Sequence, residues 1–402
     1  MPLFSEIERT DSTPARRTED SFRFLNRASG AVWDRIRSQL DSWYAAFPDA
    51  DGDLRRRFHS RDPRQHYAAW WELYLHGTLT ALDYELTVHP DIPGTKGHPD
   101  FLAERGDESF YVEGVTVFSG IVSRRPNSPL QAAVMDVIDT VDASQFMVGL
   151  KFERLGSSMP KKSEITGPIE AWLSTLDADA LLASAETGIP AEPTRVELGE
   201  WAVELRPIPR SLRFRGCPDN RLIGMGPAVG GVTNDVQKLR NAVMRKKGQF
   251  GTPDKALLVA ALPINGFIGD HVVESALFGS EAVRLNVETK ATALVRSPDG
   301  VWIGKRGPAA KRVSAVLIGT GILHHSIATA WPQVWHHFDP TYALEAELPF
   351  STVRVADDHL EVKDATRSAA DVLGLPADWP GPEPAFPRCL HRPEDHRAAG
   401  KG

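Results

Sequence analysis

The chain of 402 residues has only two cysteines, Cys217 and Cys389, which excludes a disulfide framework or a thiolate metal site. It also lacks an apolar run long enough to cross a membrane. The best candidate, ALLVAALPINGFI, is short and contains Pro263 and Asn265. The first residues, MPLFSEIERTD, are polar and acidic, which is not typical of a signal peptide. We therefore expect a protein of the reducing cytoplasm with no membrane partner.

An excess of positive charge is missing as well. The 46 Lys and Arg against 53 Asp and Glu give a net charge of −7, which argues against a protein that coats nucleic acid through a global positive field. Positive charge is nevertheless concentrated locally, in RPIPRSLRFRGCPDNR (206–221) and in MRKK (244–247). The candidate nucleic-acid contacts in the first segment are Arg206, Arg210, Arg213 and Arg215. A solvated basic face is the alternative for 206–221, and compensation of a helix dipole is the alternative for MRKK.

What is present is an ordinary globular composition, 42% hydrophobic and 25% charged. Helical spacing of apolar residues predicts helices over 31–47, 64–81, 128–141, 168–176, 234–247 and 271–278. Strands are predicted around 83–90, within 98–117, and over 145–155, 194–208, 255–262 and 312–323. This alternation predicts the α/β class.

We divide the chain into four parts: an N-terminal arm and helix (1–60), a core (61–160), an α/β extension (161–350) and a disordered Pro-rich tail (376–402).

The stretch HPDFLAERGDESFYVEGVTV (98–117) predicts two strands around a tight turn at Gly106-Asp107. With that turn, Asp100 lies opposite Glu113 on one face of the hairpin. Two like charges so close are destabilising, and a divalent cation between them would turn the repulsion into chelation by hard oxygens. The alternative is a surface hairpin with two solvated acids. The apolar surroundings of Glu113, in FYVEGVTVF, favour a functional acid.

A third acid, Glu72, lies in the predicted helix 64–81 among large apolar residues. A helix with Glu72, a strand beginning Pro99-Asp100, a strand containing Glu113, then a helix and a strand resemble the PD-(D/E)XK nuclease superfamily over roughly residues 64–155. The resemblance implies a restriction-endonuclease-like core with the order α-β-β-β-α-β. Its mixed sheet would be flanked by helices, and an α/β extension would follow.

The resemblance further implies that Asp100 and Glu113 hold Mg²⁺ or Mn²⁺, while Glu72 assists from the helix as a third metal residue. The implied activity is hydrolysis of phosphodiester bonds, with DNA as the expected partner. In that superfamily a lysine two residues after the second acid assists catalysis. Here that position is Val115, which can neither orient a water molecule nor neutralise charge.

Four basic side chains are candidates to replace this lysine: Lys96, His98, Lys151 and His76. In the predicted register His98 lies directly opposite Val115, so we rank it first. If no basic group reaches the acids, the chain would be a catalytically inactive, nuclease-like module that binds nucleic acid or protein. That module is the alternative function.

Overall fold

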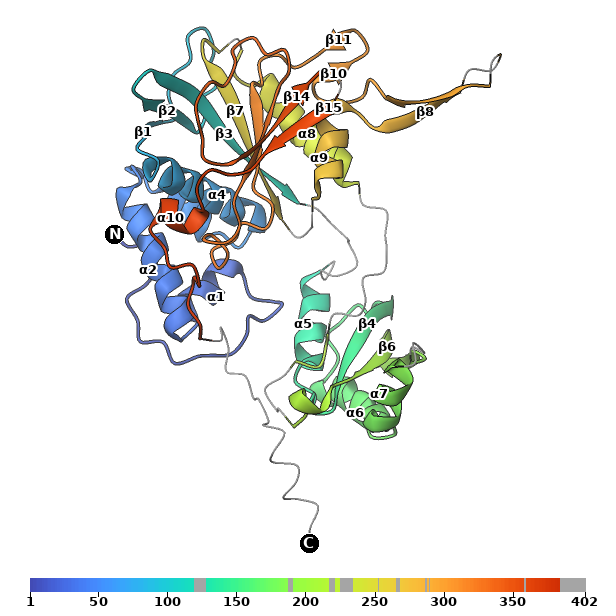
Figure 1. Ribbon diagram of the computed structural model, residues 1–402. Helices are drawn as coiled ribbons and strands as arrows, with labels where there is room; N and C mark the ends of the chain where they lie inside the picture. Colours follow the sequence, from blue (N-terminus) through green and yellow to red (C-terminus); the bar gives the residue numbers. More distant parts are fainter. Residues whose placement is uncertain are drawn as a thin grey trace. The chain divides into compact units, whose positions relative to one another are not determined.

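The computed structural model describes residues 1–118, 128–186, 191–216, 221–224, 234–251, 253–264, 268–285, 288, 290–357 and 359–383. The protein is mixed α/β, with a large mixed sheet flanked by helices (Figure 1). It consists of two compact units. The first comprises Met1–Asp11, Ser21–Ile121 and Val232–Glu383, and the second comprises Ser12–Asp20, Val122–Gly231 and Pro384–Gly402.

The first unit contains the large sheet. Its strands lie in the order β1 (Glu85–Val88), β2 (Phe101–Arg105), β3 (Glu108–Phe118), β7 (Ala256–Ile264), β12 (Ala315–Ile318), β13 (Gln333–His336), β14 (Ser351–Ala356) and β15 (His359–Lys363). The central strands β3, β7 and β12 are parallel to one another. Two hairpins lie outside this sheet: β8 (Glu281–Leu285) with β9 (Thr292–Arg296), and β10 (Ile303–Gly304) with β11 (Gly307–Pro308).

The helices of the first unit come from both ends of the chain. They are α1 (Ser21–Arg27), α2 (Ala31–Ala46), α3 (Asp53–Phe58), α4 (Pro63–Thr80), α8 (Asp235–Lys247), α9 (Asp270–Phe278) and α10 (Ala369–Leu373). Helix α4 begins at Pro63, after Asp62 accepts a hydrogen bond from the backbone N–H of Arg64, which is a standard N-cap. None of the helices in the described ranges is long and apolar enough to cross a membrane.

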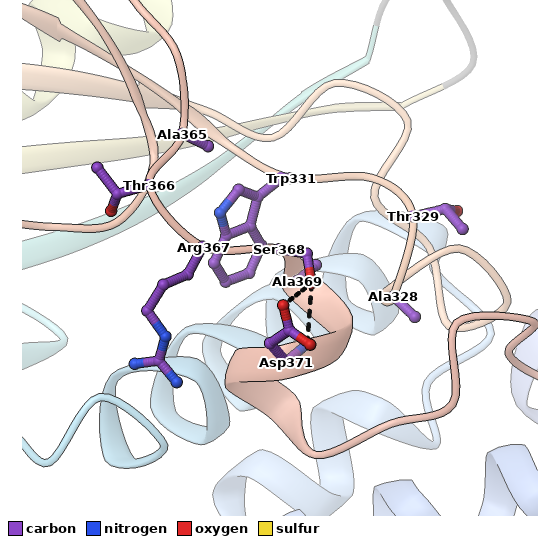
Figure 2. Close-up of a pocket in the computed structure, with 9 residues that line it drawn as sticks. All are labelled: Ala328, Thr329, Trp331, Ala365, Thr366, Arg367, Ser368, Ala369 and Asp371. Atoms are coloured by element: carbon purple, nitrogen blue, oxygen red, sulfur yellow. Dashed lines mark hydrogen bonds between the residues drawn. The ribbon is translucent and has the colours of Figure 1, made fainter.

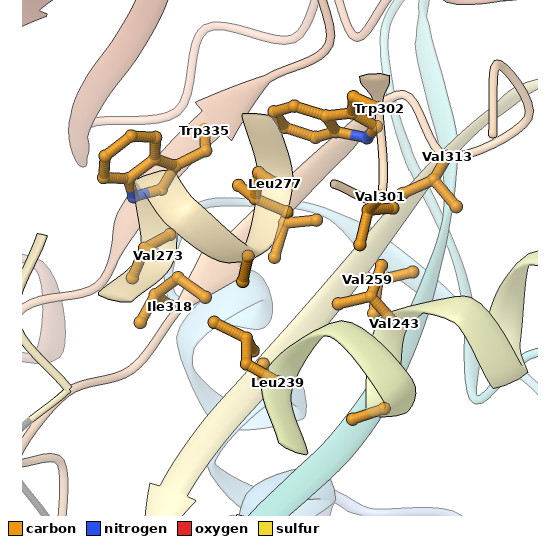
Figure 3. Close-up of a cluster of buried hydrophobic side chains, with 14 of the residues drawn as sticks. Leu239, Val243, Val259, Val273, Leu277, Val301, Trp302, Val313, Ile318 and Trp335 are labelled. Atoms are coloured by element: carbon orange, nitrogen blue, oxygen red, sulfur yellow. The ribbon is translucent and has the colours of Figure 1, made fainter. Parts of the chain in front are cut away.

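The two faces of the sheet bury different helices. On one face Trp71 of α4 donates its indole N–H to the carbonyl of Ala260 at 2.8 Å. A Cβ atom on Gly319 would come within 2.6 Å of the Trp71 ring, so only glycine allows this close packing. On the other face α8 and α9 close a core that includes Leu239, Val243, Val259, Leu277 and Trp302 (Figure 3).

The hairpin predicted from the sequence is present in the predicted register. Strands β2 and β3 are antiparallel, with Phe101 opposite Val112 and Arg105 opposite Glu108. Gly106 in the turn has a φ of 57°, a conformation that glycine adopts without strain.

Most of the second unit is formed by residues that lie between β3 and α8 in the sequence. It contains a three-stranded antiparallel sheet in the order β4 (Phe146–Arg154), β6 (Trp201–Pro209) and β5 (Thr194–Leu198). Its helices are α5 (Pro129–Ile138), α6 (Lys162–Leu173) and α7 (Ala178–Glu186). A separate apolar core joins them, with Val134, Ile138, Ile169, Trp201 and Leu205 among its buried members.

This arrangement corrects the predicted domain boundaries. Residues 128–141 and 145–155, predicted as the last helix and strand of a core at 61–160, form α5 and β4 of the second unit instead. Strand β7 joins the main sheet beside β3, and α8 packs against that sheet. Both elements come from the region assigned to an extension at 161–350. Periodicity revealed the type of each element, but it carried no information on which sheet the element joins.

The two ends of the chain also differ from the expectation. In the N-terminal arm, Leu3 and Phe4 are buried, and the backbone N–H of Leu3 donates to Oδ1 of Asp41 at 2.6 Å. Of the predicted tail at 376–402, residues 376–383 are described, and the indole of Trp379 donates to the carbonyl of His324 at 3.1 Å. The rest of the predicted tail lies outside the described residues.

Candidate active site

Asp100 and Glu113 meet where the chain enters β2 beside β3. The backbone N–H of Asp100 donates to Oε2 of Glu113 at 3.2 Å, and the backbone N–H of Gly114 donates to Oδ2 of Asp100 at 2.6 Å. These reciprocal bonds hold the two carboxylates beside each other, as the predicted register required.

Gly114 allows this close approach. A Cβ atom at this position would lie 3.1 Å from Oδ2 of Asp100 and 3.2 Å from Cδ1 of Trp71. Both distances are shorter than ordinary van der Waals contacts, so any larger residue would displace the Asp100 carboxylate or the Trp71 ring. Glu113 therefore supplies one of the two acids, and Gly114 leaves the space that the carboxylate of Asp100 occupies.

The environment of the two acids raises both pKa values. Burial raises the pKa of Asp100 well above its ordinary value, and the charges of Glu113 and Glu72 raise it further. Burial also raises the pKa of Glu113, which is 3% exposed, while the charge of Lys246 opposes the change. The site therefore holds more negative charge than its surroundings stabilise, and a bound cation would relieve this.

Glu72 lies close enough to influence both acids, but its own oxygens are occupied. Oε1 and Oε2 each accept a hydrogen bond of 2.7 Å from the guanidinium of Arg57 in α3. Such a forked pair is a strong and geometrically specific interaction. In this structure Glu72, predicted as a third metal ligand, is paired with Arg57 instead of being free for a metal ion.

The basic group at the acids is Lys246, from the last turn of α8. Its ammonium group donates to Oε1 of Glu113, and its side chain is 21% exposed. Glu113 and Lys246 meet because side chains alternate along β3, and Glu113 projects from the same face of β3 as Tyr111, which packs in the α8 and α9 core. A helix on that face therefore brings a lysine to Glu113, whereas β3 itself carries Val115 two residues further on.

Sequence reasoning missed Lys246, although a signal for it existed. MRKK was interpreted as compensation of the helix dipole or as a DNA contact. Lys246 lies three and seven positions after Val243 and Leu239, which are both buried. Spacings of three and seven place a residue on the same helical stripe, so a lysine there points towards the sheet and needs an acidic partner.

Neither of the first two predicted substitutes forms an ion pair with Asp100 or Glu113. Among the ion pairs of the described residues, His98 is paired through Nδ1 with Asp91 at 3.2 Å, and Lys96 has no acidic partner. The extrapolated register fails because β2 begins at Phe101, so the residues before Pro99 form a loop instead of continuing the ladder.

The two remaining candidates, Lys151 and His76, contact residues other than Asp100 and Glu113. Lys151 lies on β4 in the second unit, 3.6 Å from Glu204 and 3.9 Å from Glu153. His76 is buried against Phe47 and Phe101, and burial lowers its pKa to about 4. Neither side chain forms an ion pair with Asp100 or Glu113, so neither takes the place of the lysine that is absent at Val115.

The arginines predicted to bind nucleic acid belong to the second unit and have different surroundings. Arg210 is buried, and its guanidinium donates to the carbonyls of Ala143 at 2.6 Å and Arg221 at 3.0 Å. Arg215 donates to Asp179 at 2.6 Å. These two arginines therefore hold their own unit together, contrary to their expected role. Arg206 is exposed on β6, and the side chain of Arg213 lies outside the described residues.

The acid pair offers a metal ion two carboxylates. Within the described ranges no group of three or more His, Cys, Asp or Glu side chains is arranged to hold one. Oδ1 of Asp100 has no hydrogen-bond partner among those residues, whereas Glu113 shares its oxygens with Lys246 and the Asp100 backbone. Mg²⁺ often binds through only one or two carboxylates and completes its shell with water and substrate phosphate, so Asp100 and Glu113 fit it.

Two cavities among the described residues are lined by other side chains than Asp100, Glu113 and Lys246. One of about 420 Å³ is lined by residues 328–331 and 365–371 (Figure 2). In it Ser368 caps α10 through a bond of 3.1 Å from the backbone N–H of Asp371, which is a structural contact. Another, of about 680 Å³, lies within the second unit beside α6 and α7.

No family model, curated protein or solved structure matches this chain. Its functional interpretation therefore depends on the geometry and chemistry of Asp100, Glu113 and Lys246.

Proposed function

We propose that the protein is a metal-dependent nuclease that hydrolyses phosphodiester bonds, with DNA as its substrate. The observation that carries the proposal is the meeting of Asp100, Glu113 and Lys246 from three different elements. Two adjacent carboxylates with raised pKa values beside a lysine are costly to bury, and such perturbed groups cluster at functional sites.

The order of elements supports the same proposal. Helix α4, strands β1, β2 and β3, helix α8 and strand β7 follow one another in the order α-β-β-β-α-β, once the segment of the second unit between β3 and α8 is set aside as an insertion. Strand β7 lies parallel to β3, with Val259 beside Glu113. We therefore retain the restriction-endonuclease-like core as part of the proposal, with α8 and β7 as its last two elements.

In the proposed reaction Asp100 and Glu113 would hold Mg²⁺ or Mn²⁺. When bound, the ion supplies an activated water molecule and neutralises charge on the phosphate. Oδ1 of Asp100 is available to it, and Gly114 keeps the other oxygen of that carboxylate in place.

Lys246 would contribute a positive charge and a hydrogen bond that orients the phosphate or the attacking water molecule. An ammonium group has three N–H donors, so it can bond Oε1 of Glu113 and still donate to a phosphate oxygen or to the attacking water. Its partial exposure leaves one side accessible to a substrate. Arg57 pairs with both oxygens of Glu72 and fixes the position of that third acid.

A binding module without catalysis is the second candidate. It is favoured by one observation, the full commitment of Glu72 to Arg57, which leaves two acids for a metal instead of three.

Cleavage of supercoiled plasmid DNA and of a single-stranded RNA, each with Mg²⁺ or Mn²⁺, separates these functions. Lys246→Met should lower the cleavage rate about 100-fold or more, the usual contribution of a positioned proton-transfer or charge-stabilising group. Lys363→Met, at an exposed lysine of β15, is the matched control and should cleave like the wild type. Equal rates for the Lys246 variant and its control would refute the assigned role, and no cleavage by the wild type with either metal would leave the binding module.

A further inference from the structure

Unlike Lys246, three basic side chains on α8 and on the loop before Asp100 have no acidic partner among the described residues. We propose that Lys96, Arg245 and Lys247, which we name the cation rim, bind the phosphate backbone of the substrate next to Asp100 and Glu113. This inference rests on the proposed function and adds the surface through which the substrate is held.

Helix α8 provides the first part of the argument. Three of its five cations have acidic partners: Lys238 with Asp235 at 3.7 Å, Arg240 with Asp299 at 3.2 Å, and Lys246 with Glu113. The other two, Arg245 and Lys247, flank Lys246 and form no ion pair with any described residue. Arg245 is exposed and Lys247 is partly exposed, so both can reach a ligand in solvent.

The loop before Asp100 provides the second part. A Cβ atom on Gly97 would lie 2.5 Å from the carbonyl oxygen of Gln249, and one on Gly251 would lie 3.5 Å from Cβ of Thr95. The loop therefore lies directly against the turn that follows α8. It carries Lys96, which is exposed and has no ion pair among the described residues, and it leads into Asp100 within four positions.

Charge provides the third part. The protein has a net charge of −7, so a nucleic acid gains nothing from its overall field. Arg210 and Arg215, expected to bind phosphates, are used inside the second unit. Lys96 on the loop and Arg245 and Lys247 on α8 thus form a local positive surface. A nucleic acid would have to lie on this surface for its backbone to reach Asp100 and Glu113.

The test compares two double variants that each remove one arginine and one lysine. Arg245→Gln with Lys247→Gln changes the rim. Arg354→Gln with Lys363→Gln changes exposed residues of β14 and β15, four and five strands from β3 in the sheet order. At about 4.8 Å per strand the control positions are about 19 and 24 Å from β3.

Binding is measured by fluorescence anisotropy with a labelled DNA duplex in EDTA, over a series of KCl concentrations. Each phosphate contact contributes about 0.9 to the slope of log K against log salt. Loss of two contacts should flatten the slope by about 1.8 and weaken binding about 60-fold at 0.1 M KCl. Lys96→Gln should flatten it by about 0.9 and weaken binding about 8-fold. A labelled RNA duplex in parallel shows whether the rim distinguishes the two backbones.

The outcomes separate the rim from the catalytic proposal. If the rim variant binds like its control and only melts earlier, Arg245 and Lys247 merely stabilise the end of α8 and the rim is refuted. If cleavage by the wild type requires Lys246 while the rim variant binds normally, the rim fails and the nuclease stands. If the rim variant loses affinity but the wild type cleaves nothing, the rim stands and the nuclease fails.

Discussion

Lys246→Met should destabilise the protein in a pH-dependent way, because Lys246 is the cation that contacts Glu113. The ion pair is largely buried, with Glu113 3% and Lys246 21% exposed. Removing one member of a fully buried pair costs about 3–5 kcal/mol, and a hydrogen bond to a charged group contributes about 1.5–3 kcal/mol. Because the Lys246 side chain is partly exposed to solvent, we expect the free energy of unfolding to fall by about 2–3 kcal/mol at pH 8.

The sign of the pH dependence follows from the acids. Lys246 lowers the pKa of both Glu113 and Asp100, so its removal raises these values further above those of the unfolded chain. A carboxyl group with a raised folded-state pKa binds its proton more tightly in the folded protein. Stability therefore falls as pH rises from about 4, the ordinary carboxyl value, through the raised pKa. Near pH 4 the acids are protonated, and the variant should match the wild type.

Thermal unfolding at several pH values between 4 and 8 measures this effect, with Lys363→Met as the control and Lys246→Arg as a variant that keeps the charge. At pH 8 the melting temperature of Lys246→Met should be lower by about 5–10 °C, from about 2–4 °C for each kcal/mol in a domain of this size. A loss that is the same at every pH would mean that Lys246 contributes packing and not charge. No loss at pH 8 would refute the pairing with Glu113.

Two further predictions concern the metal and the second unit. Mg²⁺ or Mn²⁺ should raise the melting temperature, because an ion that binds only the folded protein stabilises it, and Asp100→Ala should abolish this shift; an unchanged shift would place the ion elsewhere. Arg210→Ala should destabilise the second unit by about 1–3 kcal/mol, since its bonds to two backbone carbonyls are lost, while the salt dependence of DNA binding stays constant. A flatter salt dependence of DNA binding in this variant would show that Arg210 contacts a phosphate after all.

The sequence by itself determined the local parts of the candidate site. The turn at Gly106 and the alternation of β2 and β3 set which residues are opposed, so Asp100 and Glu113 were placed together from 20 residues of chain. The helix carrying Glu72 was equally readable, since its apolar residues recur at helical spacing. Contacts between residues close in sequence depend on turn geometry and periodicity, and a short stretch of sequence is enough to predict both.

Only the tertiary structure decided which basic group reaches the acids. Lys246 and Glu113 are 133 positions apart, and the largest segment of the second unit lies between them in the sequence. Strand β3 could have been followed in its sheet by β4, the next strand in the chain, but it pairs with β7 instead. A parallel strand needs a crossover, and α8 provides it. Periodicity tells which face of α8 is buried, but not the strand beneath it, because that choice depends on the packing of the entire sheet.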